Sequence, residues 1–315
     1  DGYWNICSGI YFQSFFIFQK KPKQQNTSER SPEQKLPGAF CSMEELMTDE
    51  TYMRRALELA EKGAGWVSPN PLVGAVIVKD EEIIGEGYHE RYGQLHAERN
   101  ALAHCTKSPK GATIYVTLEP CCHHGKQPPC TDALLAAGIR RVVIGSKDPN
   151  PLVHGKGIRI LREHGVEVTE HVLEKECDAE NEVFFHYMQT KLPFVILKYA
   201  MTLDGKIASA SGKSKWITGE AAREQVHRMR HEMTGIMVGA GTVIADDPML
   251  NCRLPQTKDP VRIVCDTTLR IPLKSRIVQT AEEQNTIIAT CCQDEAKIRE
   301  YQKYGCRIIV TEHAD

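Results

Sequence analysis

Apolar residues become regularly spaced from Asp49 onward. They then follow the i, i+3, i+4, i+7 spacing of one helix face, at Met53, Ala56, Leu57 and Ala60. Gly63 follows the last of them and is typical of a helix end. The pattern therefore predicts an amphipathic helix at the start of the folded part of the chain.

Short apolar runs and helical patterns alternate from there to residue 190. Strands are predicted at 74–78, 83–84, 113–118, 141–144 and 166–168. Helices are predicted at 96–104, 131–137, 156–164 and 178–189. Alternation at this spacing is typical of a sheet that is covered by helices on both faces.

A second α/β unit follows a boundary near Pro193. Its predicted elements are a helix at 219–233 and strands at 194–199, 235–238, 262–265, 286–290 and 306–310. The Gly/Ser-rich stretch 205–214 lies between them, and no G-x-G-x-x-G sequence supports a Rossmann domain. A length of 315 residues fits two domains of roughly 150 residues each.

Residues 1–43 do not share this pattern. Residues 3–18 hold four of the eight Phe residues, but Asn, Ser and Gln interrupt the run, which is too short to span a bilayer. The stretch lacks the basic segment of a signal peptide. We expect a disordered extension or targeting remnant here, with a transit peptide as the weaker alternative because Arg is scarce.

Composition narrows the classes of partner. The 39 Lys and Arg residues nearly balance the 41 Asp and Glu residues, which argues against a nucleic-acid-binding surface. Twelve cysteines are spread along the chain without a dense disulfide framework. We therefore expect reduced thiols, a cytoplasmic location and a small-molecule substrate, with neither nucleic acid nor membrane as partner.

The strongest chemical signal is a His/Cys constellation. It comprises His96-Ala-Glu98, then Glu119-Pro-Cys121, then Pro128-Pro-Cys130. One imidazole and two thiolates suit tetrahedral zinc and leave a fourth position open for water, as catalytic zinc sites do. Glu98 lies two residues after His96 and can serve as the proton carrier, as in zinc nucleobase deaminases. A structural zinc knuckle, with His123 or His124 as a fourth ligand, is the alternative.

Three motifs resemble one family closely. Residues 121–130 (CCHHGKQPPC) resemble the Pro-Cys-x-His-x-Gly-x-x-Pro-Pro-Cys signature of the riboflavin-pathway pyrimidine deaminases, whereas generic cytidine and tRNA-adenosine deaminases have Cys-x-x-Cys. Residues 68–75 (SPNPLVGA) and 147–153 (KDPNPLV) resemble the same proteins. Over about residues 44–315 the chain is similar to the bifunctional RibD family, a diaminohydroxyphosphoribosylaminopyrimidine deaminase joined to 5-amino-6-(5-phosphoribosylamino)uracil reductase.

The resemblance implies a fold and a first site. Residues 44–190 would form a cytidine-deaminase-like three-layer α/β/α domain, and 191–315 a dihydrofolate-reductase-like α/β domain. In the first domain His96, Cys121 and Cys130 would bind one Zn²⁺, with Glu98 as the proton carrier. The substrate pyrimidine and its phosphoribosyl arm would be held by Asn70, His89, His123 and Lys126, and lysine suits phosphate as a point charge.

The second half resembles the family's reductase at 198–206, 214–218 and 241–248. The NADPH site would be lined by Ala200, Trp216, Thr242, Asp246 and Thr267. The phosphorylated substrate would be held by Lys198, Ser214, Arg230, Leu250 and Arg253. The family's reductase half continues past the equivalent of Asp315 and includes a glycine-rich Glu-Gly-Gly segment. We therefore expect an incomplete second domain, and a chain that deaminates without detectable reduction.

Two rival functions stay open from sequence. A nucleic-acid or nucleotide cytidine/adenosine deaminase would use the same chemistry, but the eight-residue spacing between the cysteines and the balanced charge count against it. A non-catalytic zinc-stabilised scaffold would need a fourth protein ligand. The resemblance also suggests a homo-oligomer.

Overall fold

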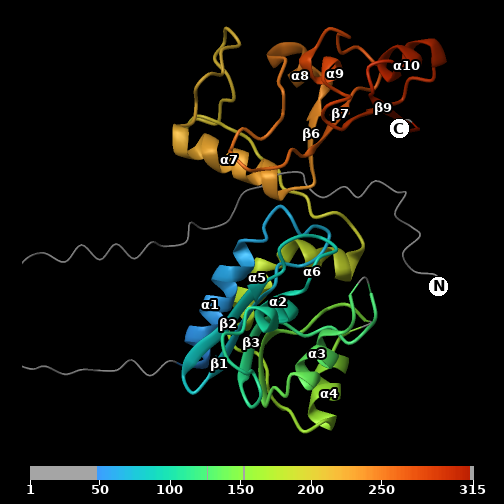
Figure 1. The fold of residues 1–315 in the computed structure, drawn as a ribbon. Helices are drawn as coiled ribbons and strands as arrows, with labels where there is room; N and C mark the ends of the chain where they lie inside the picture. Colours follow the sequence, from blue (N-terminus) through green and yellow to red (C-terminus); the bar gives the residue numbers. More distant parts are fainter. Residues whose placement is uncertain (1–47, 126, 152, 313–315) are drawn as a thin grey trace, which may run out of the picture.

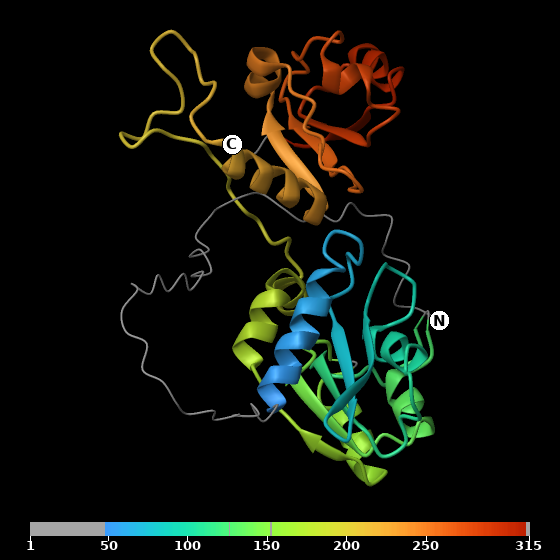
Figure 2. The same cartoon turned by 60° about the vertical axis from the view of Figure 1, so that its left-hand side comes forward.

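The computed structural model describes residues 48–312 except residues 126 and 152. The predictions made for residues 1–43 and for Lys126 therefore lie outside the described residues. Two lobes follow one another along the chain (Figures 1 and 2). No helix in the described part is long and apolar enough to cross a membrane.

The first lobe is built on a five-stranded sheet. Its strands are β1 (Gly74–Lys79), β2 (Glu82–Tyr88), β3 (Thr113–Leu118), β4 (Arg141–Ser146) and β5 (Glu167–Thr169), in the order β2-β1-β3-β4-β5. Strand β1 is antiparallel to β2 and β3, whereas β3, β4 and β5 are parallel. The central strands are apolar almost throughout because both faces of the sheet are covered.

Helices cover this sheet on both faces. One core joins Ile77, Ile114 and Val142 to α2 (Ala97–Ala103), α3 (Cys130–Ala136) and α4 (Lys156–Glu163). The other joins Val76, Tyr115 and Val143 to α1 (Asp49–Glu61) and α5 (Glu174–Glu180). Alternate residues of each strand enter different cores, as the period of two requires. The predicted three-layer α/β/α architecture is confirmed.

The single helix predicted at 178–189 is wrong. The structure has two helices, α5 and α6 (Glu182–Thr190), which meet at Asn181. The Asn181 side chain accepts from the Leu72 N–H and donates to the Leu72 carbonyl, both at 2.8 Å. The residue that interrupts the helix therefore fixes the segment that enters β1.

The second lobe contains a four-stranded parallel sheet in the order β6-β7-β8-β9. Its elements are α7 (Glu220–Glu232), β6 (Gly235–Gly239), α8 (Ala240–Asp246), β7 (Val261–Cys265), α9 (Arg276–Gln279), β8 (Thr286–Thr290), α10 (Glu295–Gln302) and β9 (Arg307–Val310). A separate core joins Met229, Val243, Val264 and Ile288. The predicted strands of this unit from residue 235 onward are confirmed within one residue.

The strand predicted at 194–199 is wrong. This segment has no regular strand and runs from the first lobe to the second, ahead of the loop that projects from the second lobe (Figures 1 and 2). Val195, Leu197 and Tyr199 alternate as in a strand, but about half of each side chain is exposed. Apolar alternation makes a strand only where a neighbouring strand and a covering layer are available.

Candidate active site

His96, Cys121 and Cys130 meet at one edge of the first sheet. His96 is the residue before α2, Cys130 is the first residue of α3, and Cys121 lies in the loop after β3. His96 Nδ1 lies 3.4 Å from the Sγ atom of each cysteine. The three ligand atoms lie within 4.8 Å of one another. The fold thus converges three donors that are up to 34 residues apart in sequence.

This donor set fits zinc. Zn–N and Zn–S bonds of about 2.1 and 2.3 Å at a tetrahedral angle place the nitrogen and sulfur about 3.6 Å apart. The observed separations of 3.4 Å are close to that value. No fourth His, Cys, Asp or Glu joins the group among the described residues, so the set matches the three-ligand pattern of catalytic zinc sites.

The surroundings of Cys121 favour its thiolate form. A hydrogen bond from the Cys130 thiol, together with the contact to His96, lowers the pKa of Cys121 to about 4. The same interaction raises the pKa of Cys130. The bond to Cys121 raises the pKa of His96. Before any metal binds, the cluster therefore already holds one negative charge next to the imidazole.

Glu98 is buried beside these ligands. It lies in the first turn of α2 and is only 3 % exposed. Burial, together with the negative charge of Cys121, raises the pKa of Glu98 to about 6. A carboxyl group with this pKa gives and takes protons readily near neutral pH. It therefore has the property that a proton carrier needs.

Asn70 and His89 form a second polar pair. His89 Nδ1 lies 2.9 Å from the Leu95 carbonyl, which can only accept, so this nitrogen carries the ring hydrogen. Burial lowers the pKa of His89 and keeps the ring neutral. His89 Nε2 then accepts from Asn70 Nδ2 at 3.0 Å. The His89 ring packs edge-on against the His96 ring at 5.4 Å, which connects this pair to the zinc ligands.

His123 lies in the loop between the two cysteines. Its Nδ1 is buried and has no hydrogen-bond partner in the described structure. Buried polar atoms are nearly always paired, so such an atom is typical of a place where a ligand binds. Lys126 follows in the same loop, outside the described residues.

Sequence reasoning missed Glu119, two residues before Cys121. Its buried carboxylate accepts from the backbone N–H groups of Gly155 at 2.9 Å and Gly157 at 3.1 Å, with longer contacts to Asp148 and Ile158. The carboxylate thus binds the start of α4 to the loop that carries Cys121. Its place in the Glu-Pro-Cys sequence is the one signal that could have indicated it.

A basic cluster lies in the second lobe. Arg230, near the end of α7, donates to the Asn251 carbonyl at 2.9 Å, and Arg253 Nη2 lies 2.9 Å from His227 Nε2. Burial and the nearby Arg230 lower the pKa of Lys198. The structure therefore brings together Lys198, Arg230 and Arg253, with Leu250 next to Asn251. His227, which sequence reasoning missed, lies on the helix face of Arg230 one turn earlier.

This cluster fits an anion. Arg230 Nε, a hydrogen-bond donor, is buried without a partner in the described structure. Guanidinium groups form a planar fork that suits phosphate oxygens. Ser214, which the resemblance assigns to the same substrate, lies instead in the projecting loop.

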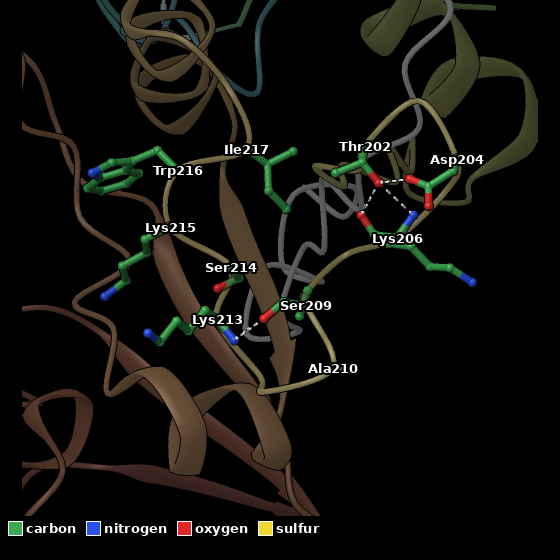
Figure 3. A pocket seen from close by; sticks show the side chains of 11 residues that line it. Thr202, Asp204, Lys206, Ser209, Ala210, Lys213, Ser214, Lys215, Trp216 and Ile217 are labelled. Carbon is green, nitrogen blue, oxygen red and sulfur yellow. Dashed lines mark hydrogen bonds between the residues drawn. The ribbon is translucent and has the colours of Figure 1, made fainter.

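Ser214 and Trp216 line a cavity of about 610 Å³ within residues 202–217. Figure 3 shows Trp216 on one side of this cavity and the hydrogen-bonded group of Thr202, Asp204 and Lys206 on the other. Trp216 is 71 % exposed and packs under the Arg223 guanidinium, 4.6 Å from the ring centre. Ala200 belongs to the same projecting segment.

The other predicted NADPH residues lie at the carboxyl edge of the second sheet. Thr242 and Asp246 are on α8, which begins directly after β6, and Thr267 follows β7. Ligands of parallel sheets bind outside this edge. The structure therefore groups these three residues and places Ala200 and Trp216 in a different segment.

Both lobes match families of known proteins. Residues 46–146 match the cytidine and deoxycytidylate deaminase zinc-binding region, and residues 193–315 match the RibD C-terminal domain. The riboflavin biosynthesis protein RibD of Actinobacillus pleuropneumoniae is 60 % identical over 264 residues, which are 84 % of this chain and 70 % of that protein. The corresponding Escherichia coli protein is 44 % identical over 280 residues, 85 % of this chain and 75 % of that protein.

Solved structures give the same result. The deaminase/reductase of Thermotoga maritima is 44 % identical with a TM-score of 0.74, covering 82 % of this chain and 80 % of that one. The RibD of Acinetobacter baumannii is 41 % identical with a TM-score of 0.75, covering 84 % and 74 %.

The fold and the sites define a bifunctional enzyme. A zinc-dependent deaminase domain is joined in one chain to a reductase domain with a dihydrofolate-reductase-like fold. The chain belongs to the RibD family of riboflavin biosynthesis. Zinc serves the deaminase half of this family and NADPH serves the reductase half.

Proposed function

We propose that the first domain hydrolytically deaminates 2,5-diamino-6-ribosylamino-4(3H)-pyrimidinone 5′-phosphate to 5-amino-6-(5-phosphoribosylamino)uracil. The observation that carries this proposal is the convergence of His96, Cys121 and Cys130 beside the buried Glu98. When bound, zinc supplies the Lewis acidity that lets a water molecule lose its proton near neutral pH.

Glu98 carries the protons of this reaction. Its carboxylate takes a proton from the attacking water and delivers it to the pyrimidine ring nitrogen. The carboxylate then takes the second proton, from the hydroxyl group that the attack has placed on the ring carbon, and gives it to the amine, which leaves as ammonia as the ring carbonyl forms. Burial and a pKa of about 6 support this role, because both protonation states are accessible at neutral pH.

Asn70, His89 and His123 hold the substrate base in this proposal. Neutral His89 fixes the Asn70 amide through Nε2, so that the Asn70 carbonyl oxygen and second amide hydrogen can read a pyrimidine edge. The unpartnered Nδ1 of His123 offers a further contact. Lys126 would pair with the phosphate as a point charge.

The second domain takes the deaminated product in this proposal, for NADPH-dependent reduction of its ribosyl group to ribityl. The match of residues 193–315 to the RibD C-terminal domain supports this step, against the expectation from sequence that the chain does not reduce. Lys198, Arg230 and Arg253 would bind the product phosphate, with Ser214 and Leu250 beside it. NADPH would contact Ala200, Trp216, Thr242, Asp246 and Thr267. Calorimetric binding of the deaminated product should weaken in Arg253→Ala and stay unchanged in Arg228→Ala, on the exposed side of α7.

We also propose a cytoplasmic homo-oligomer without nucleic-acid or membrane partners. All ten cysteines in the described residues are free, which supports a reducing compartment. The oligomeric state is measured by light scattering of the purified chain.

One comparison of substrates tests the first activity. Purified protein with measured zinc content is given the diaminopyrimidine ribosylphosphate, cytidine, dCMP or single-stranded DNA, and ammonia release is followed. We expect turnover of the ribosylphosphate alone. Turnover of cytidine or DNA instead would support the rival deaminases, and zinc without any turnover would support a scaffold.

A further inference from the structure

We propose that helix α7 of the second domain positions the substrate loop of the deaminase domain, with His231 as the positioning residue. The loop is residues 63–70, which end at Asn70. The inference rests on the proposed function, because it takes Asn70 as a residue that reads the substrate. It makes deaminase substrate binding dependent on a contact from the neighbouring domain.

The His231 ring lies directly against this loop. It packs edge-on against the Trp66 ring, with 5.1 Å between centroids and 69° between planes. Gly65 has φ of +79°, and a Cβ atom there would lie 2.5 Å from His231 Nε2. The loop backbone and the imidazole therefore touch without room for a side chain between them. One turn further, Thr234 Oγ1 lies 3.3 Å from Ser68 Oγ.

Hydrogen bonds fix the ring orientation. His231 Nδ1 accepts from the Lys258 backbone N–H at 3.0 Å. Burial lowers the pKa of His231, so the ring is neutral and its hydrogen lies on Nε2. The Ala64 backbone hydrogen-bonds to the same ring. His231 thus connects Lys258 of the second domain to Ala64 of the first, with one ring nitrogen for each.

The other side of the loop reaches the deaminase site. The Arg91 guanidinium covers Trp66 at 4.4 Å, and the Trp66 carbonyl accepts from the Tyr92 N–H at 3.2 Å. Both residues follow His89, the partner of Asn70. The Asn70 N–H donates to the Val67 carbonyl at 2.9 Å, which closes the loop. Trp66 therefore lies between His231 and the segment that carries His89.

Helix α7 also reaches the second site. Arg230, the neighbour of His231, belongs to the basic cluster and donates to the Asn251 carbonyl. Figures 1 and 2 show the end of α7 above the loop that follows α1. The last turn of α7 thus carries both His231, which contacts the substrate loop of the deaminase domain, and Arg230, which belongs to the basic cluster of the second domain.

Asn and Gln variants of His231 distinguish a residue that positions the substrate loop from one that only supports the fold. The Asn side-chain oxygen can replace Nδ1 and keep the Lys258 contact, whereas the Gln amide can replace Nε2 and keep the Ala64 contact. We expect His231→Ala to raise KM for the diaminopyrimidine ribosylphosphate about 5- to 30-fold, with kcat changed less than about threefold and zinc content unchanged. His231→Gln should restore KM in part, and His231→Asn should not.

Arg228→Ala, on the exposed side of the same helix, is the matched control and should behave as wild type. Equal KM values in His231→Ala and Arg228→Ala would overturn the inference, as would rescue by Asn rather than Gln.

A second readout does not need turnover. Hydrogen exchange of the backbone amides at 66–70 should be faster in His231→Ala than in wild type and Arg228→Ala. Equal exchange in all three proteins overturns the positioning role. If the wild type fails to deaminate this substrate while exchange still responds to His231→Ala, the proposed function is wrong and the loop contact stands.

Discussion

A proton carrier in a deaminase must lose and regain a proton within one turnover, and the surroundings of Glu98 allow this. The carboxyl group is buried on the first turn of α2, where solvent cannot stabilise its charge. The negative charge of Cys121 raises the same pKa, whereas a hydrogen bond with Cys130 lowers it. His96, two residues away, stays at the edge of the helix and faces both cysteines. A spacing of two residues thus separates the proposed metal ligand from the proton carrier.

Glu98→Gln tests the proton carrier. Gln has the same shape but cannot carry the proton, so kcat should fall about 10²- to 10⁴-fold. Zinc content by atomic absorption and the circular dichroism spectrum should not change. Loss of zinc together with activity would make Glu98 a ligand, and near-normal turnover would remove it from the mechanism.

Cys121→Ser and Cys130→Ser test the ligand assignment. Serine is a poor zinc ligand, and each variant would retain only two of the three donors. We expect loss of both bound zinc and deaminase activity. Cys122→Ser, in the same loop, is the control and should keep both. Full zinc occupancy in either ligand variant would contradict the assignment.

Helices and strands were predictable where the chain's own periodicity decides them. The strands at 74–79 and 113–118 are buried on both faces, so their apolar runs match the structure. Residues 178–189 and 194–199 were mispredicted because tertiary contacts decide them. Asn181 binds Leu72 far away in sequence, and the segment near Val195 has the alternation of a strand but forms only a single bridge position, at Leu197.

The residues of the site also fall into two groups, those that the sequence indicates and those that only the fold brings together. The convergence of the proposed zinc donors was predictable because each lies in a short motif of specific chemistry, as Glu98 does beside His96. His227 and His231 bind backbone groups that no motif contains, so only the fold reveals them. Glu119 also binds distant backbone groups, and its place beside Pro120 and Cys121 was the one signal for it in the sequence.

Helix α1 is joined to the sheet by a charged network. Asp49 accepts two hydrogen bonds from Arg141 on β4, at 3.0 and 2.7 Å, and one from Tyr115 on β3 at 2.9 Å. The Arg141 bond lowers the pKa of Asp49. Because the folded pKa is depressed, this stabilisation is present above the unfolded pKa of about 3.9 and is lost as pH falls through the folded value.

Asp49→Asn should therefore lower the free energy of unfolding by about 1–2 kcal/mol at neutral pH. The difference from wild type should shrink as the pH falls below about 4. Urea unfolding at several pH values measures both effects. Glu50→Gln, an exposed neighbour that pairs with Arg54 at 3.5 Å, controls for the loss of charge at the helix start. Equal destabilisation by the two variants at neutral pH would contradict the network's role.

Each domain in the described part of the chain has its own hydrophobic core, and the two domains touch at His231 and Thr234. The core around Val264 and Ile288 has no residue in common with the two cores of the first domain. The proposed zinc ligands all belong to the first domain. Since a ligand stabilises only the unit whose folded state binds it, zinc should protect one domain and leave the other unchanged.

Calorimetry of the whole chain tests this division. We expect two unfolding transitions, of which a chelator lowers only one. Zinc at 100-fold excess over its dissociation constant contributes about 2.7 kcal/mol, which for a domain of this size moves the midpoint by roughly 10 °C. Cys130→Ser, which should hold no zinc, is the control in which the chelator moves neither transition. A single transition that the chelator lowers as a whole would show that the domains unfold as one unit, because stabilisation of one core would then reach the other through the α7 contact.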